Sequence, residues 1–148
     1  MTAEILNKAR KYCTYQERSQ QELRDKLYEL GLYKKDVEQV IAAMVEEGYL
    51  NEERFAIAYA GGKFRVKQWG KVKIKLALKQ KRVSDYCVKK ALAQIPDKDY
   101  EDALQKVIAA QSKKITEKNI LKKNYKIAQY VIGKGFEPDL VWDVITNI

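Results

Sequence analysis

The stretch Leu30–Ile41, LGLYKKDVEQVI, has a counterpart near the end of the chain, Lys134–Ile145, KGFEPDLVWDVI. Both segments have a glycine in second place and apolar residues at the same positions after it. Such similarity at a distance indicates that the chain is built from repeated supersecondary units. Five apolar positions recur without a gap 51 residues on and again 53 residues further: Leu23, Leu27, Leu32, Val37, Ile41; Ile74, Leu78, Val83, Val88, Leu92; Ile127, Val131, Phe136, Val141, Ile145.

The repeat decides the secondary structure of the middle of the chain. Between Lys71 and Leu78, lysines alternate with apolar residues, which taken alone is the pattern of a half-buried strand. The corresponding stretch of the first copy has its leucines at helical spacing, Leu23 and Leu27 among them. We therefore predict a helix here and an all-α fold. Three tandem three-helix, helix-turn-helix-like repeats are expected, stacked into an elongated, curved body, at residues 1–50, 51–96 and 97–148.

Residues typical of helix ends support this division. Ser19 and Glu22 have the spacing of a capping box, in which each side chain accepts a hydrogen bond from the backbone N–H of the other residue. Gly31 is placed to adopt the left-handed conformation that ends a helix, Asn51 to cap the following helix, and Pro138 to open the last one. A first helix is expected near residues 3–16.

The composition excludes most kinds of catalytic chemistry. The chain has no histidine, which removes the commonest general base and the commonest metal ligand. It also lacks the glycine motifs that bind phosphates. Cys13 and Cys87 are too few for a disulfide framework or a metal motif, and we expect both to be small buried residues. We therefore expect that the protein is not an enzyme, that it has no catalytic residue, and that it binds no metal and no cofactor.

The apolar residues are spread too thinly for a membrane protein. No run approaches the roughly 18 consecutive apolar residues of a membrane-spanning helix. The N-terminal residues MTAEILNKARKYC lack the apolar segment and cleavage site of a signal peptide. We expect a cytoplasmic protein that does not contact a membrane.

The net charge of +9 is concentrated in the middle of the chain. Residues 1–50 have 8 basic and 9 acidic side chains, residues 51–96 have 12 and 3, and residues 97–148 have 9 and 8. The stretch Lys63–Arg82 contains cations and no acid, and apolar residues lie between the cations. A disordered tail would lack those apolar residues, so the stretch is expected to fold and to bind a polyanionic partner.

Short motifs follow one another along the chain: Arg18-Ser19, Glu22-Leu23, Lys26-Leu27, Gly48-Tyr49-Leu50-Asn51-Glu52, Arg54-Phe55-Ala56, Tyr59, Trp69-Gly70, Lys73-Ile74 and Leu78. In this order and spacing they resemble the RecX family, regulators of the bacterial recombinase RecA. The resemblance implies a cytoplasmic, non-enzymatic modulator that acts in DNA repair and the SOS response. It implies binding in the groove of the RecA filament on single-stranded DNA and inhibition of the recombinase, ATPase and co-protease activities.

The partners follow from the same resemblance. RecA in its filament is the expected protein partner. Some members of the family also bind DNA weakly, which implies contacts to a single- or double-stranded DNA backbone without sequence preference. We expect the protein itself to be a monomer.

Cations of the middle segment are the expected binding residues. On a helix that begins near Gly70 and turns by 100° per residue, four of these cations form one stripe that lies apart from the core face. They are Lys71, Lys75, Lys79 and Arg82. This stripe is either a solubilising face or an electrostatic track for phosphates or an acidic protein surface. Arg65 and Arg82 are suited to bidentate contacts, whereas lysines act as point charges. The expected RecA- or DNA-binding residues are Lys63, Arg65, Lys67, Lys71, Lys75, Lys79 and Arg82.

Several neighbours of the stripe leave two interpretations open. Val72 and Leu76 fall off the core face, where they either pack on a neighbouring helix or form an exposed apolar strip for a partner. Trp69 is either a stacking platform for a base or, as we favour, an anchor at a helix junction. Arg18 and Arg24 would extend the cationic track, although both have acidic neighbours.

An alternative function comes from the expected fold. Three-helix units with a tight turn also resemble helix-turn-helix domains that bind DNA directly. That function predicts preference for particular DNA sequences and usually a dimer, whereas a cationic stripe alone predicts neither.

Overall fold

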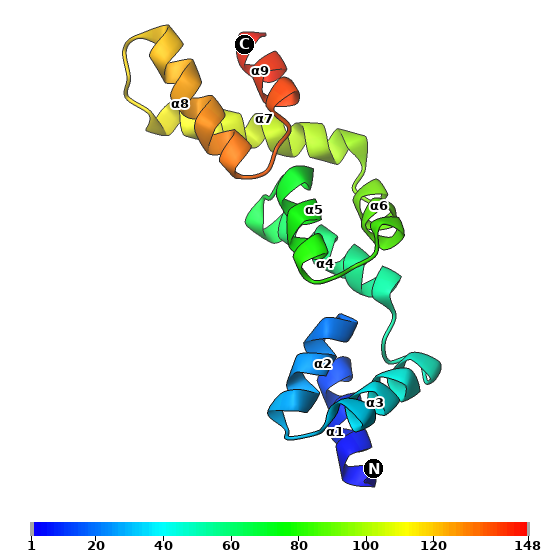
Figure 1. The fold of residues 1–148 in the computed structure, drawn as a ribbon. Coiled ribbons are helices and arrows are strands. Elements are labelled where there is room, and N and C mark those ends of the chain that lie inside the picture. Colours follow the sequence, from blue (N-terminus) through cyan, green and yellow to red (C-terminus); the bar gives the residue numbers. More distant parts are fainter. Residues whose placement is uncertain (1, 148) are drawn as a thin grey trace. The chain divides into compact units, whose positions relative to one another are not determined.

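The computed structural model describes residues 2–147, and this part of the chain folds into nine α-helices without a strand (Figure 1). The all-α prediction is confirmed, and the helices α1, α2 and α3, then α4, α5 and α6, then α7, α8 and α9 follow as three-helix repeats. Their bounds are α1 Ala3–Tyr15, α2 Gln20–Glu29, α3 Lys34–Glu46, α4 Glu52–Lys67, α5 Lys71–Gln80, α6 Asp85–Ala93, α7 Asp97–Lys114, α8 Ile120–Gly133 and α9 Pro138–Thr146.

Contacts divide the chain into two compact units. The first unit consists of the chain up to Tyr59 and of Leu78–Ala91. The second unit consists of Ala60–Ala77 and of the chain from Leu92 onward. Helices α4, α5 and α6 contribute residues to both units. The predicted repeat boundaries, after residue 50 and after residue 96, rest on the sequence pattern and remain our proposal.

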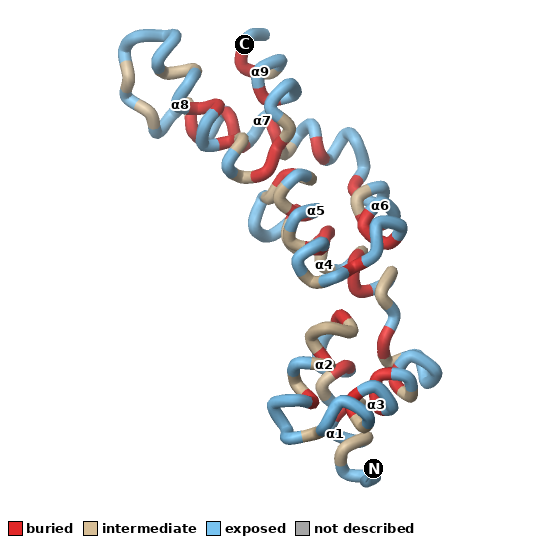
Figure 2. The backbone as a smooth tube through the Cα atoms, in the orientation of Figure 1, coloured by how far each residue is buried: buried red, intermediate tan, exposed pale blue. Residues whose placement is uncertain are grey.

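The recurring apolar positions form the cores. Of the fifteen residues in the three copies, all are buried except Leu32 and Leu92, which are half-buried. Figure 2 shows buried positions recurring along the helices. In the middle copy Ile74 and Leu78 are fully buried within α5. The repeat therefore predicted the helix correctly where the alternation of lysines and apolar residues indicated a strand.

The predicted helix ends are also confirmed. Ser19 Oγ accepts a hydrogen bond from Glu22 N at 3.0 Å, and the Glu22 carboxylate accepts one from Ser19 N at 2.9 Å. Asn51 Oδ1 accepts from Arg54 N at 2.8 Å, and Pro138 lies in the first turn of α9. These caps satisfy backbone N–H groups that have no partner within their own helix.

One backbone position with positive φ is shared by all three repeats. It follows the second helix of each repeat, where φ is +92° at Gly31, +63° at Arg82 and +102° at Gly135. The left-handed conformation was predicted at Gly31, and the alignment of the copies places Arg82 at the same position. For a residue with a Cβ this conformation costs about 1–2 kcal/mol. Arg82 therefore occupies a position at which the other two repeats have glycine.

Replacing Arg82 with glycine is expected to raise the free energy of unfolding by about 1 kcal/mol, because glycine adopts positive φ without steric cost. Gly31→Ala should do the reverse, and lower it by about the same amount. Denaturant unfolding with an unchanged m value measures both changes. A less stable Arg82→Gly variant would contradict this account of the position.

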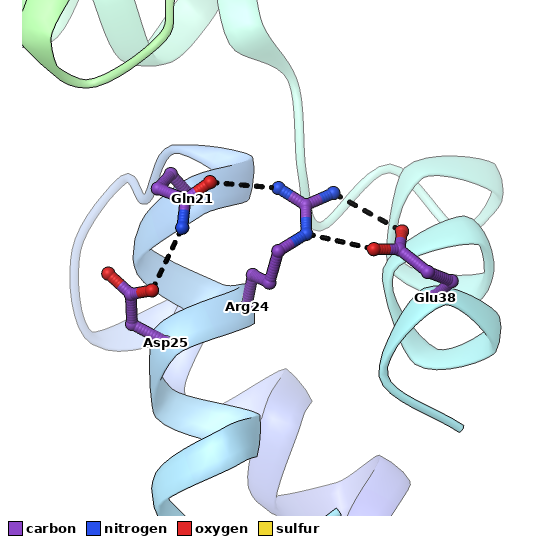
Figure 3. A network of polar contacts seen from close by, with 4 residues as sticks. All are labelled: Gln21, Arg24, Asp25 and Glu38. Carbon is purple, nitrogen blue, oxygen red and sulfur yellow. Dashed lines mark hydrogen bonds and ion pairs between the residues drawn. The ribbon is translucent and has the colours of Figure 1, made fainter. Parts of the chain in front are cut away.

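The two arginines that were candidates to extend the track are engaged within the first repeat. Arg24 of α2 binds Glu38 of α3 through two hydrogen bonds, at 2.9 and 3.2 Å, and also donates to Gln21 (Figure 3). The bond to Arg24 lowers the pKa of Glu38. Arg18 Nε donates to the Tyr12 carbonyl at 3.0 Å, and its guanidinium lies 3.8 Å from the Tyr12 ring centroid. Both arginines thus stabilise the repeat.

The cysteines match their predicted environment. Cys13 and Cys87 are buried free thiols, and burial raises the pKa of each. Within residues 2–147, none of the helices combines the length and the apolar character that crossing a membrane requires.

Candidate functional site

The stretch Lys63–Arg82 comprises the end of α4, a short connection, α5 and the two residues that follow α5. Its residues up to Ala77 belong to the second unit, and the remainder belongs to the first unit. The candidate cations Lys79 and Arg82 therefore lie in the first unit, and the other five lie in the second.

Groups of the third repeat hold the beginning of α5. The first backbone N–H groups of a helix have no partner within the helix and need an acceptor elsewhere. Here three consecutive groups find acceptors far along the chain, so the first turn of α5 is fixed in place. Gly70 N donates to Lys134 O at 2.8 Å, Lys71 N to Tyr100 Oη at 2.9 Å, and Val72 N to Gly135 O at 2.9 Å.

Tyr100 is the side chain at the centre of this contact. It is buried, its hydroxyl accepts from Lys71 N, and it donates to the Glu137 carboxylate. Burial and the bond to Glu137 raise its pKa. Its ring packs between Phe64 and Phe136, at centroid distances of 5.9 and 5.2 Å. The hydroxyl thus links a helix terminus to a carboxylate from within an aromatic cluster.

The Tyr100→Phe variant is expected to lose about 1–3 kcal/mol of folding free energy, because it leaves a backbone N–H of α5 without its acceptor and Glu137 without its donor. Thermal or denaturant unfolding measures the loss. Tyr130→Phe removes a hydroxyl from an exposed tyrosine and should change stability by less than about 0.5 kcal/mol. Equal stability of the two variants would show that the hydroxyl of Tyr100 does not hold α5.

Trp69 lies in the connection between α4 and α5 and is half-buried. The Nζ atoms of Lys63 and Lys73 lie 5.0 and 4.5 Å from its ring centroid, within the range of cation–π attraction. Its backbone N–H donates to Lys63 O at 3.1 Å. These contacts favour the interpretation of Trp69 as an anchor of the helix junction over that of a stacking platform.

The candidate cations differ in how far their charges are already compensated. Arg65, Lys67, Lys75 and Arg82 are exposed, and among residues 2–147 their side chains have no ion-pair or hydrogen-bond partner. Lys71 lies 4.7 Å from the Tyr100 ring centroid, and Lys79 forms an ion pair with Asp85. Lys79 therefore offers less charge to a partner than its position in the stripe suggested.

Apolar side chains accompany these cations on the surface. Val72 and Leu76 of α5 are 51 % and 60 % exposed, so of the two interpretations left open the exposed apolar strip fits the structure and packing on a neighbouring helix does not. Val66, near the end of α4, is 77 % exposed. Exposed apolar groups next to cations are suited to a partner that is both acidic and partly apolar.

The sequence pattern did not distinguish two of these residues. Val66 stands between Arg65 and Lys67 as one of several apolar residues among the cations, and nothing in the pattern marked it as more exposed than Val72 or Leu76. Tyr100 accepts a hydrogen bond from the backbone N–H of Lys71, which lies 29 residues away in the sequence, and no local pattern connects the two residues.

Together these features define a protein built from three-helix repeats, with cations and apolar side chains exposed on its middle repeat. Two family models match it: "RecX, first three-helix domain" over residues 6–43 and "RecX, second three-helix domain" over residues 51–92. The two matches cover more than half of the 148 residues, and the chain belongs to the RecX family.

Individual relatives agree with this assignment. The Regulatory protein RecX of Clostridium perfringens is 32 % identical over 139 residues, and that of Bacillus mycoides is 27 % identical over 131 residues. Each alignment covers 88 % of this chain. It covers 62 % of the length of the Clostridium perfringens protein and 48 % of the length of the Bacillus mycoides protein, so this chain spans less than two thirds of either relative.

Solved structures share the fold. A crystal structure of RecX from Lactobacillus salivarius has a TM-score of 0.86 at 24 % identity, covering 98 % of this chain and 94 % of that one. A second, of regulatory protein RecX, has a TM-score of 0.85 at 19 % identity, covering 99 % and 73 %.

Proposed function

We propose that this protein is a non-enzymatic regulator that binds the RecA filament on single-stranded DNA and inhibits its recombinase, ATPase and co-protease activities. One observation carries the proposal. The segment with the exposed, uncompensated cations lies wholly within the match to the second RecX domain, residues 51–92. Such a regulator acts in the cytoplasm, in DNA repair and the SOS response.

The binding residues we propose are the seven candidate cations, and they differ in weight. Arg65, Lys67 and Lys75 belong to one unit, are exposed, and break no internal contact when they bind an anion. Lys79 has to give up Asp85 first. Because contacts of this kind displace counterions, the affinity is expected to fall steeply as salt is added.

The exposed apolar strip favours the filament over DNA alone as the main partner. Val72 and Leu76 gain from burial against a protein surface, at roughly 25 cal/mol for each Å² of apolar area removed from water. A phosphate backbone offers them no such surface. Arg65 and the lysines would then contact acidic side chains of the filament, its DNA, or both.

Co-sedimentation with preassembled filaments tests the proposal. RecA is assembled on single-stranded DNA with a non-hydrolysable ATP analogue, and this protein is added over a range of concentrations. We expect saturable association that weakens with salt. Association with DNA alone that equals association with the filament would contradict the proposal, and preference for one duplex sequence would favour the helix-turn-helix alternative instead.

A further inference from the structure

A second cationic cluster lies in the third repeat and is hidden when charge is summed over the whole repeat. Residues 113–126 have six lysines and one acid, a net charge of +5. The flanking stretches 97–112 and 127–148 each have a net charge of −2, so the repeat sums to +1. The lysines lie at the end of α7, in the loop and at the start of α8: Lys113, Lys114, Lys118, Lys122, Lys123 and Lys126.

Large apolar side chains are exposed within this cluster. Ile120 is 65 % exposed, Leu121 78 % and Tyr125 57 %. Exposed apolar groups that lie together mark interaction surfaces more often than they mark plain solvent-facing helix. Leu121 and Tyr125 line a surface hollow together with Glu117, Lys122 and Lys126. Burial and charge therefore single out the same few residues.

The helix arranges these residues in two adjacent rows. Residues four apart lie on the same side of a helix, so Leu121 and Tyr125 form an apolar row and Lys122 and Lys126 form a cationic row beside it. The Tyr125 hydroxyl accepts a hydrogen bond from Gln129 Nε2 at 3.1 Å. Its hydroxyl is thus engaged by its own helix, while the ring remains accessible.

We propose that this surface, the α8 patch of Leu121, Lys122, Tyr125 and Lys126, binds single-stranded nucleic acid. A single strand presents bases that stack on aromatic rings and phosphates that pair with cations, and the two rows match these two needs. Duplex DNA offers its phosphates but keeps its base faces stacked inside. An acidic protein segment would match the lysines but would leave the ring of Tyr125 without a stacking partner.

Glu117 acts against this ligand. Its carboxylate forms an ion pair with Lys126 Nζ at 3.2 Å and accepts a hydrogen bond from Asn119 N at 3.2 Å. A phosphate has to displace this carboxylate from Lys126. Removing its charge should therefore strengthen binding, an effect that a purely structural role of the patch does not produce.

Fluorescence anisotropy with a labelled single-stranded oligonucleotide, the whole chain and no RecA tests the proposal. The double variant Lys122→Glu, Lys126→Glu should weaken binding at least tenfold, Tyr125→Ala about fivefold, and Glu117→Gln should tighten it a few fold. The control Lys35→Glu, Lys106→Glu changes the net charge equally at two exposed lysines outside the patch. It should have a smaller effect than the patch variant.

The same measurements are repeated in a protein in which Arg65, Lys67 and Lys75 are changed to glutamate, so that the middle repeat no longer contributes to binding. In this background the α8 patch variants should have the same effects on affinity. Equal losses in the patch variant and in its control would overturn the proposal. So would binding of duplex as tight as that of single strand together with an unchanged Tyr125→Ala variant. Displacement of the oligonucleotide by poly-glutamate as effectively as by unlabelled single strand would instead identify an acidic protein as the ligand. Because RecA is absent, these outcomes do not depend on filament inhibition.

Discussion

Replacing Gly70 with alanine is expected to destabilise the second unit by about 3 kcal/mol, near the upper end of what overpacking costs. A Cβ at Gly70 would lie 2.3 Å from the carbonyl carbon and oxygen of Gly135 and from Phe136 N. All three are backbone atoms, so no side-chain rotation relieves the overlap. The first turn of α5 would have to leave the carbonyl oxygens and the hydroxyl that hold it. We expect a melting temperature lower by about 10 °C.

Gly62→Ala is the matched control for this variant. A Cβ at Gly62 meets no atom within 4 Å, and the residue lies inside α4. Alanine is preferred over glycine there by up to about 1 kcal/mol, so this variant should be more stable than the parent. If Gly70→Ala melts at the same temperature as the parent, the close approach of Gly70 to Gly135 does not hold α5.

Reversing the charges of Arg65, Lys67 and Lys75 is expected to weaken binding to the RecA filament about 100-fold. Each substitution removes an attraction and adds a repulsion, and a 100-fold loss corresponds to about 2.7 kcal/mol in total. The three side chains are exposed and make no ion pair or hydrogen bond among the described residues, so the fold should survive. The slope of log affinity against log salt should fall by roughly three.

A triple variant elsewhere separates position from net charge. Lys11, Lys35 and Lys106 are exposed and lie outside the middle segment, and their change to glutamate shifts the net charge by the same amount. This control should lose only a few fold in affinity, through the long-range field. Unfolding curves are compared for both variants. Equal losses of affinity in the two would show that the middle repeat has no special role.

Most of the fold was predictable because the sequence repeats three times, so that each position can be compared with the equivalent positions of the other two copies. The alternation around Ile74 indicated a strand, and only the helical pattern of Leu23 and Leu27 at the same repeat position overrode it. The same comparison aligns Arg82 with Gly31 and Gly135, so its positive φ could have been predicted too.

The details of the site were less predictable because they depend on contacts distant in sequence. The acceptor of Lys71 N is a hydroxyl 29 residues away, and the pairing of Lys79 with Asp85 depends on the turn between α5 and α6. Charge summed over whole repeats identified the middle segment, but it hid the lysines around Tyr125, because acidic residues on either side of them cancel the sum.

RecA-dependent ATP hydrolysis on single-stranded DNA, measured while this protein is titrated in at fixed ionic strength, tests the central claim most directly. The account predicts that the parent protein and the Lys11, Lys35, Lys106 control suppress hydrolysis at similar concentrations. The folded Arg65, Lys67, Lys75 variant should need about 100-fold more protein for the same effect. Hydrolysis that continues unchanged at saturating parent protein would contradict the proposed function, and full inhibition by the charge-reversed variant at the parent's concentration would contradict the proposed site.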